Sequence, residues 1–191
     1  LLDVGGAWRW LSGSEDAIAR IPAGIRELTT EDRARAAGLE KLSAAQLLRR
    51  DASREVVWVR TDEELDHAAT ALYSETIVGL DVETTLDTHI LCLIQLATSQ
   101  RTFLIDALDV TDLEPLRRFL EADGITKIIH NADFERKVLG RQGIAINAVA
   151  DTLSLSREKH GPSADGGHSL RAVVWRELER DLDKSQQVSD W

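Results

Sequence analysis

Two carboxylates, Asp81 and Glu83, stand two residues apart at the end of the apolar segment TIVGLDVETT. Side chains two apart on a β-strand point to the same face, so a strand here aims both negative charges at one place. Like charges held that close repel each other and raise each other's pKa. Burying such a pair is costly unless a counter-charge lies nearby.

A strand end that runs into solvent is the simple interpretation of an Asp-x-Glu pair, and it applies to most of them. Three features of this sequence favour a functional site instead. The pair lies at a strand end, where open α/β sheets place their ligands. The segment KIIHNADFE repeats the pattern, with Asp133 in the first turn of a helix, and the apolar segment ILCLIQLAT would bury the neighbouring strand.

A divalent metal supplies the missing counter-charge. Carboxylate and water oxygens are the ligands that Mg²⁺ and Mn²⁺ prefer. Two such ions about 3.5–4 Å apart stabilise the attacking and leaving oxygens of an in-line phosphoryl displacement. The sequence therefore predicts a metal site held by Asp81, Glu83 and Asp133.

The elements that must position these acids alternate between strand and helix. Hydrophobic patterns predict strands at 54–60, 76–83, 90–98, 102–107 and 126–131, and helices at 61–75, 112–123, 133–143 and 166–179. Thr61 and Glu64 form a capping box at the start of the first helix. The expected fold is α/β, with a mixed sheet whose antiparallel three-strand start is extended by parallel strands and flanked by helices.

Composition narrows the class of protein. The 191 residues divide into a helical or irregular lead-in, 1–53, and a domain from 54 to 191, with 43% hydrophobic residues to form a core. The formal net charge of −10 argues against a nucleic-acid coat protein, but not against an enzyme that meets phosphates through metal ions.

The single cysteine, Cys92, lies in an apolar strand and excludes an internal disulfide, which favours a cytoplasmic setting. No apolar run is long enough to span a membrane.

Several motifs occur in an order that resembles the ribonuclease D-like 3′–5′ exonucleases, the Tyr-type subgroup of the DEDD superfamily. They are LDVETT, LCLIQLAT, LIDAL, KIIHNADFE, DTL and LDKSQQVSDW, and together they cover about residues 54 to 191. The resemblance implies a ribonuclease H-like fold. It also implies two-metal hydrolysis of RNA or single-stranded DNA from the 3′ end, with release of nucleoside monophosphates.

The resemblance also implies residue roles. Asp81 and Glu83 correspond to the first motif of the family and Asp133 to the aspartate of the second motif. The 3′-terminal nucleotide is expected to lie along Thr84, Thr85, His130, Asn131 and Phe134. Asp151 resembles a position that caps the following helix.

The third motif of the family contributes a Tyr and a fourth metal-binding Asp, and it is expected beyond Trp191. The domain is therefore expected to be incomplete at its C-terminus, and residues 1–191 alone are expected to have little or no nuclease activity. The alternative hypothesis is a catalytically inactive nucleic-acid-binding or scaffold module with the same fold. The retained acids favour the enzyme, because a module without catalysis has no reason to keep clustered like charges.

Overall fold

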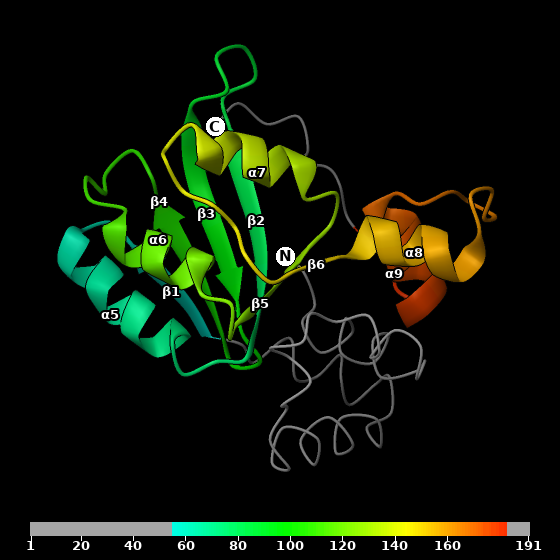
Figure 1. Cartoon of the computed structure of the whole chain (residues 1–191), viewed down its shortest axis with the longest axis horizontal. Helices are drawn as coiled ribbons and strands as arrows, with labels where there is room; N and C mark the ends of the chain where they lie inside the picture. The colour runs from blue at the N-terminus through cyan, green and yellow to red at the C-terminus, as the bar shows by residue number, and fades with distance from the viewer. Residues whose placement is uncertain (1–54, 183–191) are drawn as a thin grey trace.

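The computed structural model describes residues 55–182, so the expectations for the lead-in 1–53 and for the segment DKSQQVSDW, residues 183–191, lie outside the described residues. Within that range one six-stranded sheet has the strand order β1-β4-β3-β2-β5-β6 (Figure 1). The strands are β1 Glu55–Val59, β2 Ile77–Thr84, β3 Leu91–Ala97, β4 Arg101–Asp106, β5 Thr126–Ile129 and β6 Val149–Asp151. The helices are α5 Asp62–Leu72, α6 Glu114–Glu121, α7 Asp133–Gly140, α8 Thr152–His160 and α9 Leu170–Leu178.

The pairing confirms the predicted mixed sheet. Strands β2, β3 and β4 follow one another as antiparallel neighbours. Strand β1 then adds parallel to β4 at one edge, and β5 and β6 add parallel beyond β2 at the other. The strand that carries Asp81 and Glu83 consequently lies in the interior of the sheet, with a partner on each side.

The two faces of the sheet are covered differently. Alternate residues of β2, such as Leu80 and Val82, belong to the main core, which also contains apolar residues of α5, α6 and α7. Figure 1 shows α5 and α6 in front of the strands at the left, and α7 across the upper parts of β2 and β3. The other face has a smaller cluster of Ile77, Ala97 and Ile128, against which Leu155 of α8 packs. Because side chains alternate along a strand, Asp81 and Glu83 belong to this second face.

Local sequence signals explain individual elements. Helix α5 begins with the predicted capping box: Thr61 Oγ1 accepts the backbone N–H of Glu64 at 3.2 Å, and Glu64 Oε2 accepts that of Thr61 at 3.2 Å. Cys92 is buried in β3, as its apolar surroundings predict. None of the helices between residues 55 and 182 has the length and apolar character needed to cross a membrane.

Lys127 is a lysine buried within the main core side of β5. It has no exposed surface, and its Nζ donates a hydrogen bond to the carbonyl oxygen of Ala122 at 2.7 Å. The same ammonium lies 5.9 Å from the centre of the Phe119 ring. Burial lowers the pKa of Lys127 to about 8, and the charge of Asp123 partly opposes that effect. The Lys127 ammonium therefore donates a hydrogen bond at the C-terminal end of α6, and this contact requires the burial of a charge.

Candidate active site

The pair on β2 is positioned by the register of the sheet. Asp81 and Glu83 are half-buried, while the residues that alternate with them face the main core. Gln95 of β3 lies directly opposite Asp81 in the antiparallel ladder. Its side-chain Nε2 donates to Glu83 Oε1 over 3.4 Å, a long hydrogen bond. The two acids are thus held on one face, with an amide from the neighbouring strand beside them.

Both acids of the pair are harder to ionise than in water. Burial raises the pKa of Asp81. Burial also raises the pKa of Glu83, and the negative charge of Asp81 raises it further. The repulsion that the Asp-x-Glu spacing predicts is therefore present in the structure, and a cation placed beside the pair would relieve it.

Asp133 has surroundings unlike those of this pair. It is the first residue of α7, and its side chain is 92% exposed. The nearest charged partner of its carboxylate is Arg136, one turn further along the helix at 3.8 Å. The structure places the carboxylate of Asp133 in solvent, and its role as a third ligand beside Asp81 and Glu83 stays a prediction.

Glu135, two residues further on, is the buried acid of α7. Its residue surface is only 4% exposed, and its Oε2 atom is buried without a hydrogen-bond partner among the described residues. Burial raises the pKa of Glu135 to about 7, and the charges of Asp81, Asp151 and Glu83 add to that effect. The negative charges of both β2 acids therefore act on the Glu135 carboxylate.

The helical period could have identified Glu135 from the sequence. The buried residues of α7 are Glu135, Val138 and Leu139, which have the i, i+3, i+4 spacing of one helix face. Asp133 lies off that stripe. The Asp133 assignment followed the acid that begins the helix, whereas the apolar stripe indicates which acid of the helix is buried.

The other residues expected to contact substrate lie around the same end of β2. Thr84 is the last residue of β2, and Thr85 begins the connection to β3, where its Oγ1 accepts the backbone N–H of Ile90 at 2.9 Å. His130 and Asn131 follow β5, which runs parallel to β2. They therefore lie beyond the carboxyl end of β5, at the same end of the sheet as the carboxyl end of β2.

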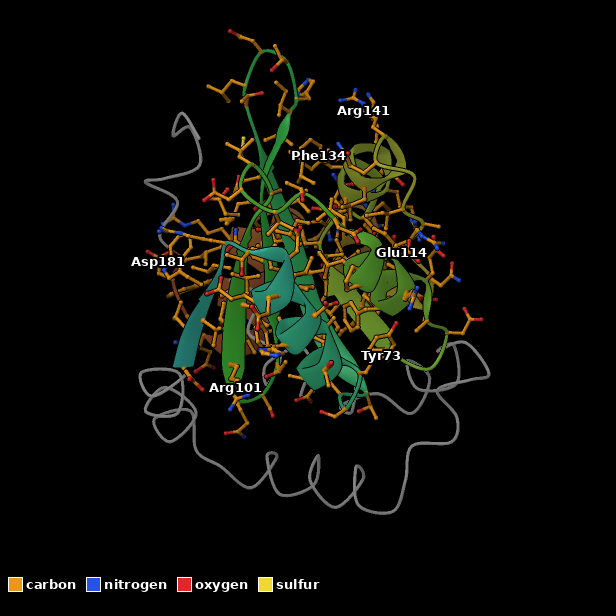
Figure 2. The ribbon with its side chains drawn as sticks, turned by 90° about the vertical axis from the view of Figure 1, so that its left-hand side faces the viewer. Tyr73, Arg101, Glu114, Phe134, Arg141 and Asp181 are labelled. Atoms are coloured by element: carbon orange, nitrogen blue, oxygen red, sulfur yellow. The ribbon has the colours of Figure 1, made fainter. Side chains whose placement is uncertain are left out.

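Phe134 is 39% exposed although its side chain is large and apolar. Figure 2 shows Phe134 in the upper part of the molecule, toward the loop that joins β2 and β3, whereas Arg101 and Tyr73 lie at the opposite end. An exposed aromatic ring beside the carboxyl end of β2 is suited to stacking on a base.

The donor set fits a divalent cation. Among residues 55–182 no three or more His, Cys, Asp or Glu side chains already stand in ligand geometry. Even so, a buried carboxylate oxygen of Glu135 lacks a partner, and burial raises the pKa of Asp81, Glu83 and Glu135 alike. Oxygen donors of this kind suit Mg²⁺ or Mn²⁺, whose charge would compensate the three carboxylates.

Sequence comparison relates most of the chain to nucleases. Residues 56–191 match the sequence profile of 3′-5′ exonuclease domains. DNA polymerase I of Aquifex aeolicus (strain VF5) is 35% identical over 138 residues, which cover 70% of this chain and 22% of the polymerase. Ribonuclease D of Pseudomonas paraeruginosa (strain DSM 24068 / PA7) is 27% identical over 140 residues, which cover 72% of this chain and 37% of that protein. The chain thus spans well under half the length of either relative.

Structural comparison agrees with the fold expected from the motifs. The crystal structure of Escherichia coli RNase D, described as an exoribonuclease involved in structured RNA processing, superposes with a TM-score of 0.64 and 27% sequence identity. The superposition covers 72% of this chain and 37% of RNase D. The predicted ribonuclease H-like architecture is confirmed.

Proposed function

The chain belongs to the 3′-5′ exonuclease family, and on that premise we propose that it hydrolyses RNA or single-stranded DNA from the 3′ end. Water adds to the terminal phosphodiester phosphorus, the bond to the 3′-oxygen of the preceding nucleotide breaks, and a nucleoside monophosphate leaves. The observation that carries the proposal is the buried, unpartnered carboxylate oxygen of Glu135, in a residue that senses the charges of Asp81 and Glu83.

The proposed metal ligands are Asp81, Glu83 and Glu135, with Glu135 in the role that the sequence alone assigned to Asp133. Bound Mg²⁺ or Mn²⁺, two ions in the complete site, would supply positive charge at the reacting phosphate and a water of lowered pKa. Asp81 and Glu83 share one strand, so the sheet fixes the distance between them. Gln95 restrains Glu83 through its 3.4 Å contact.

Substrate binding is proposed for the residues around the carboxyl end of β2. The ring of Phe134 would stack on the 3′-terminal base, since stacking accepts any base. The set proposed to lie along the terminal nucleotide is Thr84, Thr85, His130, Asn131 and Phe134. A site that meets phosphates through metal ions also explains how a chain with a net charge of −10 could bind a polyanion.

The test compares degradation of labelled oligonucleotides by the full-length wild-type protein and by Asp81→Asn. RNA and DNA strands of one sequence are used, each with a free or a blocked 3′ end. We expect stepwise shortening from the free 3′ end only, dependent on Mn²⁺ or Mg²⁺, and lost in Asp81→Asn. Equal cleavage by the variant would contradict the assignment of the site. Binding of the strand and of Mn²⁺ without any cleavage would favour the non-catalytic module.

A further inference from the structure

Asp151 contacts the backbone of the turn that leads into α7. Its Oδ1 accepts the backbone N–H of Asn131 at 2.9 Å, and its Oδ2 accepts that of Ala132 at 3.2 Å. Oδ1 also accepts the N–H of Leu153 at 2.9 Å, which caps the first turn of α8. One carboxylate therefore joins the start of α8 to the start of α7.

The shape of the turn explains why an anion fits there. Asn131 has a φ of 67°, in the left-handed region that asparagine tolerates better than most residues. Ala132, the next residue, returns to the right-handed helical region with a φ of −58°. Successive N–H groups in such a turn point into one concavity that binds negative charge. The carboxylate of Asp151 occupies the concavity formed by residues 131 and 132.

A second side chain at the start of α8 holds the same segment. Thr152 Oγ1 lies 2.9 Å from Nδ1 of His130 and donates to the carbonyl oxygen of Ile129 over 3.3 Å. Thr152 is buried, so these contacts are shielded from water. Asp151 and Thr152 together tie four consecutive residues, 129–132, to the first turn of α8.

This connection holds the segment from which α7 begins. Each residue turns a helix by about 100°, so a change in the conformation of residues 131 and 132 would rotate the helix about its axis. Glu135 is the third residue of α7 and lies on its buried stripe. We infer that Asp151 is a positioning residue, which holds the 131–132 turn so that the Glu135 carboxylate meets Asp81 and Glu83. The inference rests on the proposed role of Glu135 as a metal ligand.

Asp151 itself is a poor candidate for a metal ligand. Both of its oxygens accept backbone N–H groups, three in all. Binding a cation would require Asp151 to give up contacts that cap α8 and close the turn. Glu135, by contrast, has an oxygen without a partner among the described residues.

The Asp151→Asn variant separates the two contacts. Asparagine is as good a helix cap as aspartate. Its Oδ1 can still accept the backbone N–H of Leu153, so α8 stays capped. The amide Nδ2 cannot accept the N–H of Ala132, so the turn loses its second anchor. We expect the Mn²⁺ affinity of the full chain, measured by titration calorimetry, to fall about tenfold. Amide exchange at Ala132 should accelerate, while the unfolding midpoint in EDTA changes little.

Loss of charge is distinguished from loss of position by Asp151→Glu. This variant keeps the negative charge near Glu135 but moves the carboxylate by one methylene group. If Asp151 acts by position, both variants lose Mn²⁺ affinity and both speed exchange at Ala132. Wild-type affinity in Asp151→Glu together with weakened affinity in Asp151→Asn would overturn the inference in favour of a purely electrostatic effect.

The Glu135→Gln and Asp81→Asn variants test the underlying site. If these two variants lose Mn²⁺ binding while both Asp151 variants keep it, the inference is wrong and the proposed site stands. If Glu135→Gln and Asp81→Asn bind Mn²⁺ as the wild type does, the proposed site is wrong, and the inference is overturned with it. Fast exchange at Ala132 in the Asp151 variants would then show only that Asp151 holds the turn.

Discussion

Asp133 and Glu135 lie two residues apart in the first turn of α7, and their carboxylates have opposite surroundings: the Asp133 side chain is 92% exposed, while Glu135 is 4% exposed. Two residues correspond to about 200° of helix rotation, which places them on opposite sides of α7. Of the two acids, only Glu135 is buried with the apolar stripe of α7.

Exchanging each of these acids for its amide tests that assignment. Glu135→Gln is expected to lower the rate of 3′-end degradation at least a hundredfold, since misplaced or missing metal ligands cost about that much. Asp133→Asn is expected to retain activity within about twofold, because its carboxylate lies in solvent. The measurement is single-turnover release of the terminal nucleotide. Greater loss in Asp133→Asn than in Glu135→Gln would reverse the assignment.

The stability of the metal-free protein should depend on pH in a direction set by the same acid. The pKa of Glu135 rises from its ordinary 4.5 to about 7 in the folded state. The folded protein thus holds this proton more tightly than the unfolded chain, so stability is fully present below about pH 4.5 and falls as pH rises toward 7. The change corresponds to about 3 kcal/mol for this group.

Chemical denaturation in EDTA at several pH values checks that dependence. Glu135→Gln should make the decline between pH 4.5 and 7 shallower and be the more stable protein at pH 8, while the raised pKa of Asp81 and of Glu83 keeps part of the decline. Saturating Mn²⁺ should remove the decline in the wild type, because metal binds the deprotonated carboxylates. A wild-type stability that rises across this range would contradict the buried, repelled state of Glu135.

Phe134 is expected to contribute to substrate binding and not to folding. Phe134→Ala should raise KM for a 3′-terminal oligonucleotide about tenfold, since stacking of one base is worth about 1–3 kcal/mol. The unfolding midpoint should change little, because the side chain is partly exposed. Phe134→Tyr keeps the ring and should keep KM. An unchanged KM in Phe134→Ala would exclude the stacking role.

Lys127 is expected to make the stability of the folded protein depend on pH in the opposite direction to Glu135. Burial lowers its pKa to about 8, so the folded protein releases this proton more readily than the unfolded chain does. Stability should therefore increase as pH rises through 8, by about 1–2 kcal/mol up to pH 9.5. Lys127→Met should lack this increase, and the difference between the two proteins isolates it. If the stability of the wild type and of Lys127→Met changed equally between pH 8 and 9.5, the pKa of Lys127 would not be lowered by folding.

Most of the fold follows from local patterns, whereas the third proposed acid of the site follows only from the helical period of α7. The apolar runs of β2 and β3 and the Thr61–Glu64 capping box predict their elements directly. The orientation of α7 depends instead on the left-handed conformation of Asn131 and on Asp151, which comes from a later part of the chain. A contact between residues twenty apart in the sequence, such as Asn131 and Asp151, produces no local sequence pattern, and only the apolar stripe of α7 indicates how the helix is turned.

The topology of the sheet sets an order in which the acids come together during folding. Strands β2, β3 and β4 are consecutive antiparallel neighbours, so Asp81, Glu83 and Gln95 meet through short-range contacts. Glu135 arrives only after β5 has paired parallel with β2, which needs the crossover through α6. Short-range contacts tend to form early and crossover pairings late.

The repulsion among the three carboxylates is consequently absent from most of the folding pathway and present in the native state. Interactions that form after the transition state affect the unfolding rate and leave the folding rate nearly unchanged. We expect Mn²⁺ to slow unfolding in stopped-flow experiments without accelerating folding. Metal supply would then govern how long the folded nuclease persists, and not how quickly it is made.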